Sequence, residues 1–269
     1  MHMRRTWGGG VLLSLIFGLL LTGCGSGGGD EVVPVAGTSA PEGIYSGTSG
    51  NGRTMWGTVL NDGSYWFLYS AIGDPTFVGG VIQGTGQFSQ DTFASVDTHD
   101  FSDFGSLLEA VISGSYERKV SLTGNMTVNT GGGTTFNLNY STASEATPNL
   151  ALLAGTYPGG SAEEGSVQTP HHILVDGNGG LRIVRPSSPG VLFMYNGWTI
   201  VPCQMTGTIE PRAVGHVYDL TLYEGCTLNG QPQGPYPGIA VFDPVTNRLG
   251  LIAISKDRQK VFLYDGVKP

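Results

Sequence analysis

The strongest constraint on the fold of this chain is an alternation of apolar and polar residues with a period of two. In the run VSLTGNMTV, residues 120–128, Leu122, Met126 and Val128 fall on one face, whereas serine, threonine and asparagine fall on the other. The run TTFNLNYS, residues 134–141, repeats the alternation, and the intervening NTGGG has the glycines that a hairpin turn needs. Because successive side chains of a strand point to opposite faces, this pattern predicts half-buried antiparallel strands.

A further strand-like run is apolar on both faces. In SYWFLYS, residues 64–70, Tyr65 and Phe67 alternate with Trp66 and Leu68. We expect this strand to be covered on both sides or to line a cavity.

One stretch departs from the period of two. Phe104, Leu107, Leu108 and Val111 have helical spacing, which predicts a short helical turn that runs into a strand.

The composition agrees with a β-protein and excludes one class of partner. Of the 269 residues, 44 are glycine and 15 are proline, and only 13% are charged, which suits short strands joined by many turns. The formal net charge of -8 would repel nucleic acid phosphates, so we expect no nucleic acid partner.

Several phrases of the sequence occur twice. GIYSG at Gly43 resembles GTYPG at Gly155, and VLNDGSYWF at Val59 resembles ILVDGNGGL at Ile173. This degenerate duplication predicts two all-β units, residues 43–149 and 150–269. Each has a suitable length for a small antiparallel β-barrel or a β-sandwich.

The N-terminus has the parts of an export signal. Arg4 and Arg5 precede an apolar segment from Val11 to Leu21, and this segment is too short for the roughly 20 residues that span a bilayer. We therefore expect residues 1–23 to be a cleaved signal peptide. Residues 24–42 are rich in glycine, serine and proline and are expected to form a flexible tether.

The end of this signal, Leu21-Thr22-Gly23-Cys24, resembles the lipobox of bacterial lipoproteins. The resemblance implies that Cys24 is lipidated, palmitate included, and becomes the first residue of the mature chain. Lipoproteins of this kind carry three acyl chains, which anchor a protein firmly to a membrane. Gly25 stands where an inner-membrane retention signal has aspartate, which implies the outer membrane and leaves its periplasmic and surface faces both open.

The general plan is similar to that of duplicated β-barrel surface lipoproteins, such as transferrin-binding protein B. No specific motif of that family is present, so none of its binding residues is assigned here.

Two cysteines remain, Cys203 and Cys226, in a chain expected to be exported. The oxidising environment outside the cytoplasm favours a disulfide, which would stabilise the second unit by about 3 kcal/mol. If the flanking runs form a hairpin centred near residues 212–214, the two cysteines lie about one diagonal step from opposite each other. A catalytic cysteine and a zinc ligand are the alternatives.

Candidate catalytic and metal-binding residues do not form a known motif. There is no nucleophile elbow of the form G-x-S-x-G, and DGNGG at Asp176 lacks the acidic residue that would complete a calcium loop. The remaining candidates are histidines and paired carboxylates, which we interpret as solvated loop residues: His99, His171, His172, His216, Asp97, Asp100, Glu163 and Glu164. We therefore expect no metal, no cofactor and no catalytic residues.

The sequence thus predicts a lipid-anchored envelope lipoprotein with a non-catalytic binding or structural role, whose partner is an unidentified envelope or extracellular component. One alternative is a barrel that carries a small apolar ligand, with Trp56, Tyr65 and Trp66 facing that ligand. Core packing is another explanation for these aromatic residues. The second alternative is an envelope hydrolase whose site forms only in the fold.

Overall fold

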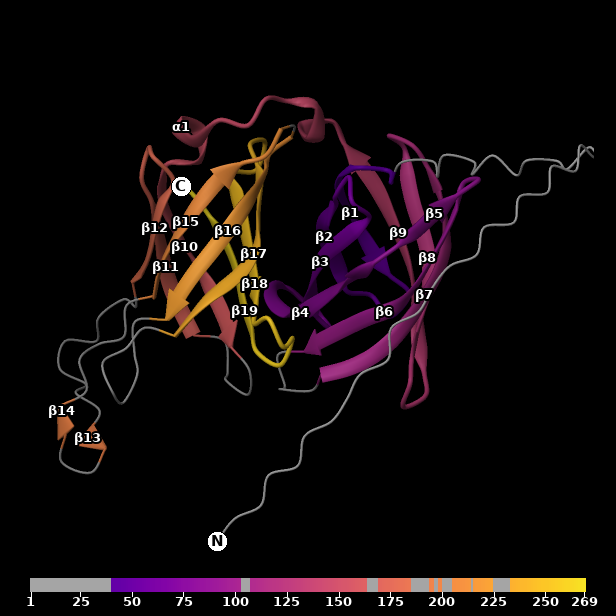
Figure 1. Cartoon of the computed structure of the whole chain (residues 1–269), viewed down its shortest axis with the longest axis horizontal. Coiled ribbons are helices and arrows are strands. Elements are labelled where there is room, and N and C mark those ends of the chain that lie inside the picture. Colours follow the sequence, from indigo (N-terminus) through magenta and orange to yellow (C-terminus); the bar gives the residue numbers. More distant parts are fainter. Residues whose placement is uncertain are drawn as a thin grey trace, which may run out of the picture. The chain divides into compact units, whose positions relative to one another are not determined.

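The computed structural model describes residues 40–102, 107–163, 169–184, 194–195, 198–199, 205–213, 215–224 and 233–269. Residues Gly37–Pro269 group into one compact unit. Within it, the chain forms two closed eight-strand antiparallel β-barrels, as Figure 1 shows. The all-β prediction is confirmed, and the units are barrels rather than sandwiches.

In the first barrel, neighbouring strands follow one another along the chain, and β4 pairs with β6 to close the sheet. The short strand β5, Gln87–Ser89, pairs with β6 next to the end of β4. The eight barrel strands are β1 (Gly43–Ser49), β2 (Thr54–Val59), β3 (Ser64–Ala71), β4 (Asp74–Thr85), β6 (Thr92–Ser102), β7 (Leu107–Glu117), β8 (Ser121–Val128) and β9 (Gly133–Ser141).

A short connection joins the barrels through the 3-10 helix η1, Thr142–Glu145, and the single-turn helix α1, Leu150–Leu153. The strands of the second barrel are β10 (Gly155–Glu163), β11 (Thr169–Val175), β12 (Gly180–Val184), β15 (Met205–Pro211), β16 (Val217–Glu224), β17 (Gln233–Asp243), β18 (Arg248–Ile254) and β19 (Val261–Val267). They also pair in chain order, and β19 closes on β10. A separate two-stranded sheet consists of β13 (Met194–Tyr195) and β14 (Trp198–Thr199).

The predicted strands at residues 120–141 are present, whereas the predicted helical turn before them is a strand. The predicted hairpin at residues 120–141 is β8 and β9, with Leu122 opposite Leu138. The predicted helical turn is wrong for Leu107 to Val111, because these residues belong to β7 and pair with β6 and β8. Ala110 and Ile112 are buried whereas Val111 is 43% exposed, which is the alternation of a strand with one buried face.

The repeated phrases of the sequence form repeated structure. Tyr45 is fully buried and its hydroxyl donates to the carbonyl of Pro41 at 2.8 Å; Tyr157 is equally buried and donates to the carbonyl of Leu153 at 2.6 Å. In each barrel a tyrosine near the start of the first strand therefore bonds to the segment four residues before it.

The second hairpins of the two barrels, β2–β3 and β11–β12, also match. Gly63 and Gly179 both have a positive φ, 85° and 83°, a conformation that favours glycine. The carbonyl of Gly63 accepts the N–H of Gly86, and that of Gly179 accepts the N–H of Ile209. In both barrels, the glycine of this turn therefore has the same backbone conformation and accepts a hydrogen bond from a residue later in the chain.

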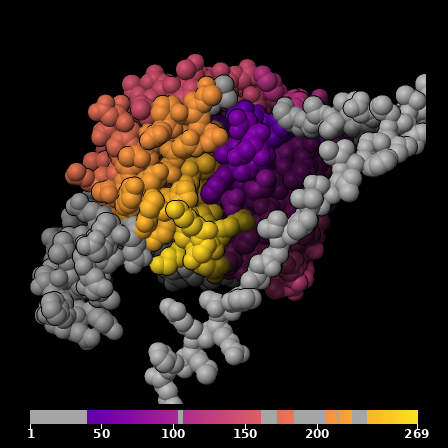
Figure 2. Space-filling model, in the orientation of Figure 1, coloured from indigo at the N-terminus to yellow at the C-terminus, as the bar shows by residue number. Residues whose placement is uncertain are grey.

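Apolar side chains form three clusters, one in each lumen and a third between the barrels. Tyr65 and Phe67 of β3 point into the first lumen, whereas Trp66 and Leu68 belong to the cluster between the barrels. This strand is therefore covered on both sides, as its sequence predicted. Figure 2 shows the indigo strands of the first barrel beside the yellow C-terminal strands of the second.

Arg258, in the turn between β18 and β19, joins the two barrels by hydrogen bonds. Its Nη2 donates to the Oε1 of Gln83 at 2.5 Å, to the backbone carbonyl of Gln83 at 3.2 Å and to that of Asp97 at 3.1 Å. Burial lowers the pKa of Arg258, and the nearby Asp97 carboxylate opposes this shift. The second barrel thus reaches the end of the first through a charged donor.

Candidate functional site

The lumen of the first barrel is filled by its own side chains. The space among its aromatic and aliphatic residues is only about 10 Å³, whereas sites for small ligands usually occupy about 300–1,000 Å³. This space is lined by Met55, Val59, Tyr65, Phe67, Ile82, Phe88, Phe93, Ile112, Leu122 and Phe136. A ligand of ordinary size would require this core to repack.

A larger hollow lies between the barrels. This inter-barrel groove has a volume of about 850 Å³ and is bounded by β1, β2 and the start of β4 on one side and by β10, β19 and the β17–β18 turn on the other. It is lined by Ile44, Ser46, Trp56, Pro75, Thr76, Phe77, Ser141, Ala143, Pro158, Gly159, Gly160, Asp243, Thr246, Arg248, Asp265, Gly266 and Val267. Its walls combine apolar side chains with a few ionic groups, as ligand sites commonly do.

A guanidinium group lies on the indole ring of Trp56 within this groove. The Cζ atom of Arg248 is 4.6 Å from the Trp56 ring centroid, within the range of a cation–π interaction. Its Nε donates to Oδ1 of Asp265 at 2.8 Å and its Nη2 donates to Oδ2 at 2.5 Å. This bidentate pair and the ring fix the guanidinium plane, and Nη1 has no hydrogen-bond partner among the described residues.

Gly250 allows the indole of Trp56 to lie against β18. A Cβ atom at position 250 would be 2.6 Å from Cζ2 of Trp56, which is closer than real Cβ atoms approach. Trp56 itself is only 6% exposed, and its Nε1 is buried without a partner in the described part of the chain. The ring therefore serves as a fixed support for Arg248.

The carboxylate of Asp243 is a hydrogen-bond acceptor next to the Arg248 guanidinium. Asp243 and Arg248 are directly opposite on β17 and β18, yet Arg248 pairs with Asp265 instead. The Asp243 carboxylate accepts the Val245 N–H at 2.9 Å and the Thr246 hydroxyl at 2.7 Å, which hold it in place. No cation pairs with Asp243 within the described ranges, so the groove contains a positioned donor and a positioned acceptor side by side.

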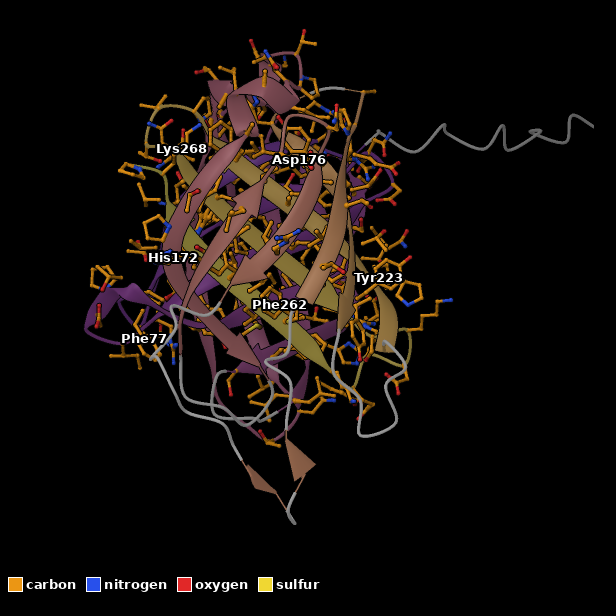
Figure 3. The ribbon with its side chains drawn as sticks, turned by 90° about the vertical axis from the view of Figure 1, so that its left-hand side faces the viewer. Phe77, His172, Asp176, Tyr223, Phe262 and Lys268 are labelled. Atoms are coloured by element: carbon orange, nitrogen blue, oxygen red, sulfur yellow. The ribbon has the colours of Figure 1, made fainter. Side chains whose placement is uncertain are left out.

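Apolar side chains border the groove. Phe77 is partly exposed at the start of β4 and lies at the margin of the view in Figure 3. Val267 lines the groove at the end of β19 and is 47% exposed. These residues give the groove an apolar edge beside its ionic pair.

The three aromatic residues predicted to face a ligand do not share one cavity. Trp56 contributes to the inter-barrel groove, and Trp66 packs against the cluster between the barrels. Tyr65 points into the first lumen, where its hydroxyl contacts Ser95 Oγ at 2.8 Å and Thr98 Oγ1 at 2.6 Å. Burial raises the pKa of Tyr65, so its phenol is neutral at physiological pH.

The polar residues near Tyr65 stabilise an irregularity of the sheet. The register of β6 shifts between Ser95 and Thr98, and the Asp97 carboxylate accepts the Thr85 N–H at 2.8 Å and the Ser95 hydroxyl at 3.0 Å. The ring of His99 contacts the backbone carbonyl of Asp97 at 2.9 Å. This arrangement holds a β-bulge and does not align these residues as a nucleophile and its base.

The interpretation as solvated loop residues is wrong for Asp97, His99 and Asp100, which lie in β6, and for His216, which is 2% exposed. His171 and His172 belong to β11 and Glu163 belongs to β10. Asp100 is bonded by the Tyr69 hydroxyl at 2.5 Å, and the Asp176 carboxylate accepts the N–H groups of Asn178 and Gly180. No cluster of three His, Cys, Asp or Glu residues that could hold a metal occurs in the described part of the chain. Cys24, Cys203, Cys226 and Glu164, with the predicted signal peptide and most of the tether, lie outside the described residues.

Among the described residues, no helix has both the length and the apolar character needed to cross a membrane. Comparison of the chain with protein-family models, with curated proteins and with solved structures finds no match.

Proposed function

We propose that this protein is a lipid-anchored envelope lipoprotein that binds its partner, without converting it chemically, in the inter-barrel groove. The observation that carries the proposal is the groove of about 850 Å³, in which Arg248 and Asp243 are held next to each other. Both side chains keep hydrogen-bonding capacity that the described residues do not use. A preformed donor and acceptor in a concave site favour ligand binding.

The N-terminal sequence supports the anchor. Leu21 to Cys24 resembles a lipobox, and Gly25 favours the outer membrane as the destination. Two or more acyl chains attach a protein to a bilayer stably. The partner would therefore be an envelope or extracellular component that the anchored barrels can reach.

The two alternatives receive less support. A small apolar ligand carried in the first barrel would have to displace a packed core, since the space there is about 10 Å³. A hydrolase needs an activated nucleophile or a metal. Among the described histidines, His99 contacts a backbone carbonyl, His216 contacts the Tyr218 hydroxyl, and His172 is exposed on β11. Non-catalytic binding is consistent with these contacts.

The anchor is tested by Cys24→Ser in cells fed radiolabelled palmitate. We expect the wild type to incorporate label and the variant to remain an unlabelled precursor. Equal labelling of the two proteins would refute lipidation at Cys24.

The groove is tested by photo-crosslinking in intact cells. A photoreactive phenylalanine analogue would replace Phe77 at the groove, or Tyr223, which is exposed on β16 outside the groove, as the matched control. We expect an adduct at position 77 that is absent at position 223. No adduct at 77, or equal adducts at both positions, would contradict binding in the groove.

A further inference from the structure

We infer that the ligand of the inter-barrel groove is a neutral polysaccharide. This inference rests on the proposed function and names the chemical class of the ligand. Two separate features carry it: the pairing of donor and acceptor in the groove, and one row of uncharged residues on the outer face of the first barrel, which starts on the strand of Ser46.

The ionic groups of the groove suit a ligand hydroxyl. Nη1 of Arg248 can donate a hydrogen bond, and the adjacent Asp243 carboxylate can accept one. A hydroxyl group both accepts and donates, so one sugar, or two neighbouring hydroxyls of it, can use both residues. The strength of each bond is increased because the protein partner is ionised.

Charged ligands fit this arrangement less well. An anion would meet two carboxylates, Asp243 and Asp265, with a single guanidinium between them. That guanidinium is already engaged by Asp265 through two hydrogen bonds. A cation would gain from Asp243 but would lie beside the positive charge of Arg248. A neutral polyhydroxyl ligand avoids both penalties.

The edge of the groove suits the apolar faces of sugar rings. Phe77 is partly exposed at the start of β4, and Val267 lines the opposite wall. Aromatic and aliphatic side chains can pack against the C–H groups of a sugar while its hydroxyls bond to Asp243 and Arg248. The volume of about 850 Å³ also lies in the range of small-molecule sites, so the groove can accept a short segment of a chain.

The outer face of the first barrel extends this chemistry beyond the groove. Ser46 of β1 lines the groove, and its strand continues to Thr48, which is opposite Asn137 of β9. The same row crosses the sheet through neighbouring strands and carries no charged residue. Its members are Thr48, Asn137, Thr123, Ser115 and Thr92.

This row is long enough to contact several sugar units. It crosses five strands, or about 19 Å at the usual spacing of about 4.8 Å. All five side chains are exposed or partly exposed, and Ser115 and Thr123 contact each other at 3.0 Å. Soluble proteins usually place many charged residues on such a face, so a neutral row in a chain of net charge -8 fits an uncharged polymer.

The test uses the full-length lipidated protein in detergent micelles and a printed array of neutral oligosaccharides of increasing length. We expect binding to at least one neutral series, with a loss of at least about tenfold in Asp243→Asn and in Arg248→Gln, as for the loss of one charge-assisted hydrogen bond. The matched controls Asp91→Asn and Arg182→Gln alter exposed residues outside the groove and should bind as the wild type does.

A variant at position 137 tests the contribution of the neutral row on the outer face. Asn137→Ala removes from the neutral row an exposed amide that can bond to sugar hydroxyls. It should weaken binding of the longer oligosaccharides and leave that of the disaccharides unchanged. If the variant binds the longer oligosaccharides as tightly as the wild type does, the part of the inference that concerns this face is refuted.

The remaining outcomes distinguish a wrong ligand class from a groove that binds no ligand. If Asp243→Asn binds every neutral oligosaccharide as tightly as the wild type, or if no neutral oligosaccharide binds, the polysaccharide is refuted. A cross-linked adduct at position 77 that contains peptide or lipid but no sugar would also refute it, while the proposed function would stand. Absence of any adduct at position 77 would refute both.

Discussion

Asp243 and Arg248 are opposite each other on neighbouring strands, but Arg248 forms its ion pair with Asp265. The choice follows from geometry, because Asp265 receives two parallel hydrogen bonds while the guanidinium lies on Trp56. Asp243 is instead held by the turn that follows it. The groove therefore has a donor and an acceptor that do not neutralise each other.

Arg258 should stabilise the contact between the barrels. Arg258→Ala removes the donor that Gln83 and the carbonyl of Asp97 share, and we expect a loss of about 1–3 kcal/mol in the free energy of unfolding. Urea unfolding measures the loss, and Lys256→Ala, an exposed position in the same turn, is the control. An unchanged unfolding midpoint in Arg258→Ala would show that these bonds are not needed.

His216 should make the stability depend on pH. It is 2% exposed, with Tyr218 Oη at 3.4 Å from Nδ1 and the ring of Phe242 at 5.9 Å. Burial lowers its pKa, and the negative charge of Asp243 opposes the shift. The unfolded chain then binds a proton more readily than the folded one.

The direction in which stability changes with pH follows from this difference in proton binding. Stability contributed by neutral His216 is complete above its ordinary pKa of about 6.5 and decreases as the pH falls below that value. Urea midpoints measured between pH 7.5 and pH 5 should fall in the wild type and fall less in His216→Asn. Parallel pH curves for the two proteins would contradict this role.

Asp100 should change the stability with pH in the opposite direction to His216. Burial raises the pKa of this carboxyl, although the Tyr69 hydroxyl and Arg53 favour the charged form. Its contribution to stability is complete below the ordinary pKa of about 3.9 and is lost as the pH rises through the raised value. Asp100→Asn keeps an acceptor for Tyr69, so we expect a higher urea midpoint at pH 7 and no gain at pH 3.5. A lower midpoint at pH 7 would mean that the charge is stabilising.

The two cysteines remain a predicted disulfide, and the observed register strengthens the case. Met205 of β15 is opposite Glu224 of β16, and Pro211 is opposite Tyr218. The predicted hairpin centre near residues 212–214 was therefore slightly too early in the chain. Cys203 and Cys226 lie outside the described residues, two positions beyond Met205 and Glu224 respectively.

The residue numbers of each pair in this ladder sum to 429, as do those of Cys203 and Cys226, so the disulfide remains a prediction. We expect no free thiol in denatured, unreduced mature protein. Cys203→Ser should expose one thiol, at Cys226, and lower the unfolding free energy by about 2–4 kcal/mol. Two free thiols in the wild type would refute the bond.

The period of two was sufficient to predict β3, β8 and β9, and the repeated phrases predicted the two units. It also identified β3 as a strand covered on both sides, since Trp66 and Leu68 interrupt what would otherwise be a polar face. It failed at Leu107 to Val111, where an apolar run fits helical and strand spacing alike and the pairing with β6 decides.

The candidate site was not predictable in the same way. Asp243, Arg248 and Asp265 come from different strands and form no motif in the sequence. The pairing of β17, β18 and β19 brings them together, and the ring of Trp56 from the first barrel lies against Arg248. Of the aromatic residues singled out in the sequence, Trp56 alone lines the inter-barrel groove.

The most direct test of the central claim is amide hydrogen exchange of the protein in its native envelope, compared with the same protein purified in detergent. If the inter-barrel groove is occupied in the envelope, amides at residues 76–78 and 245–248 should exchange more slowly there, whereas the turn at residues 177–180 should not change. Equal exchange of the groove segments in both preparations would contradict the claim that the groove binds an envelope component.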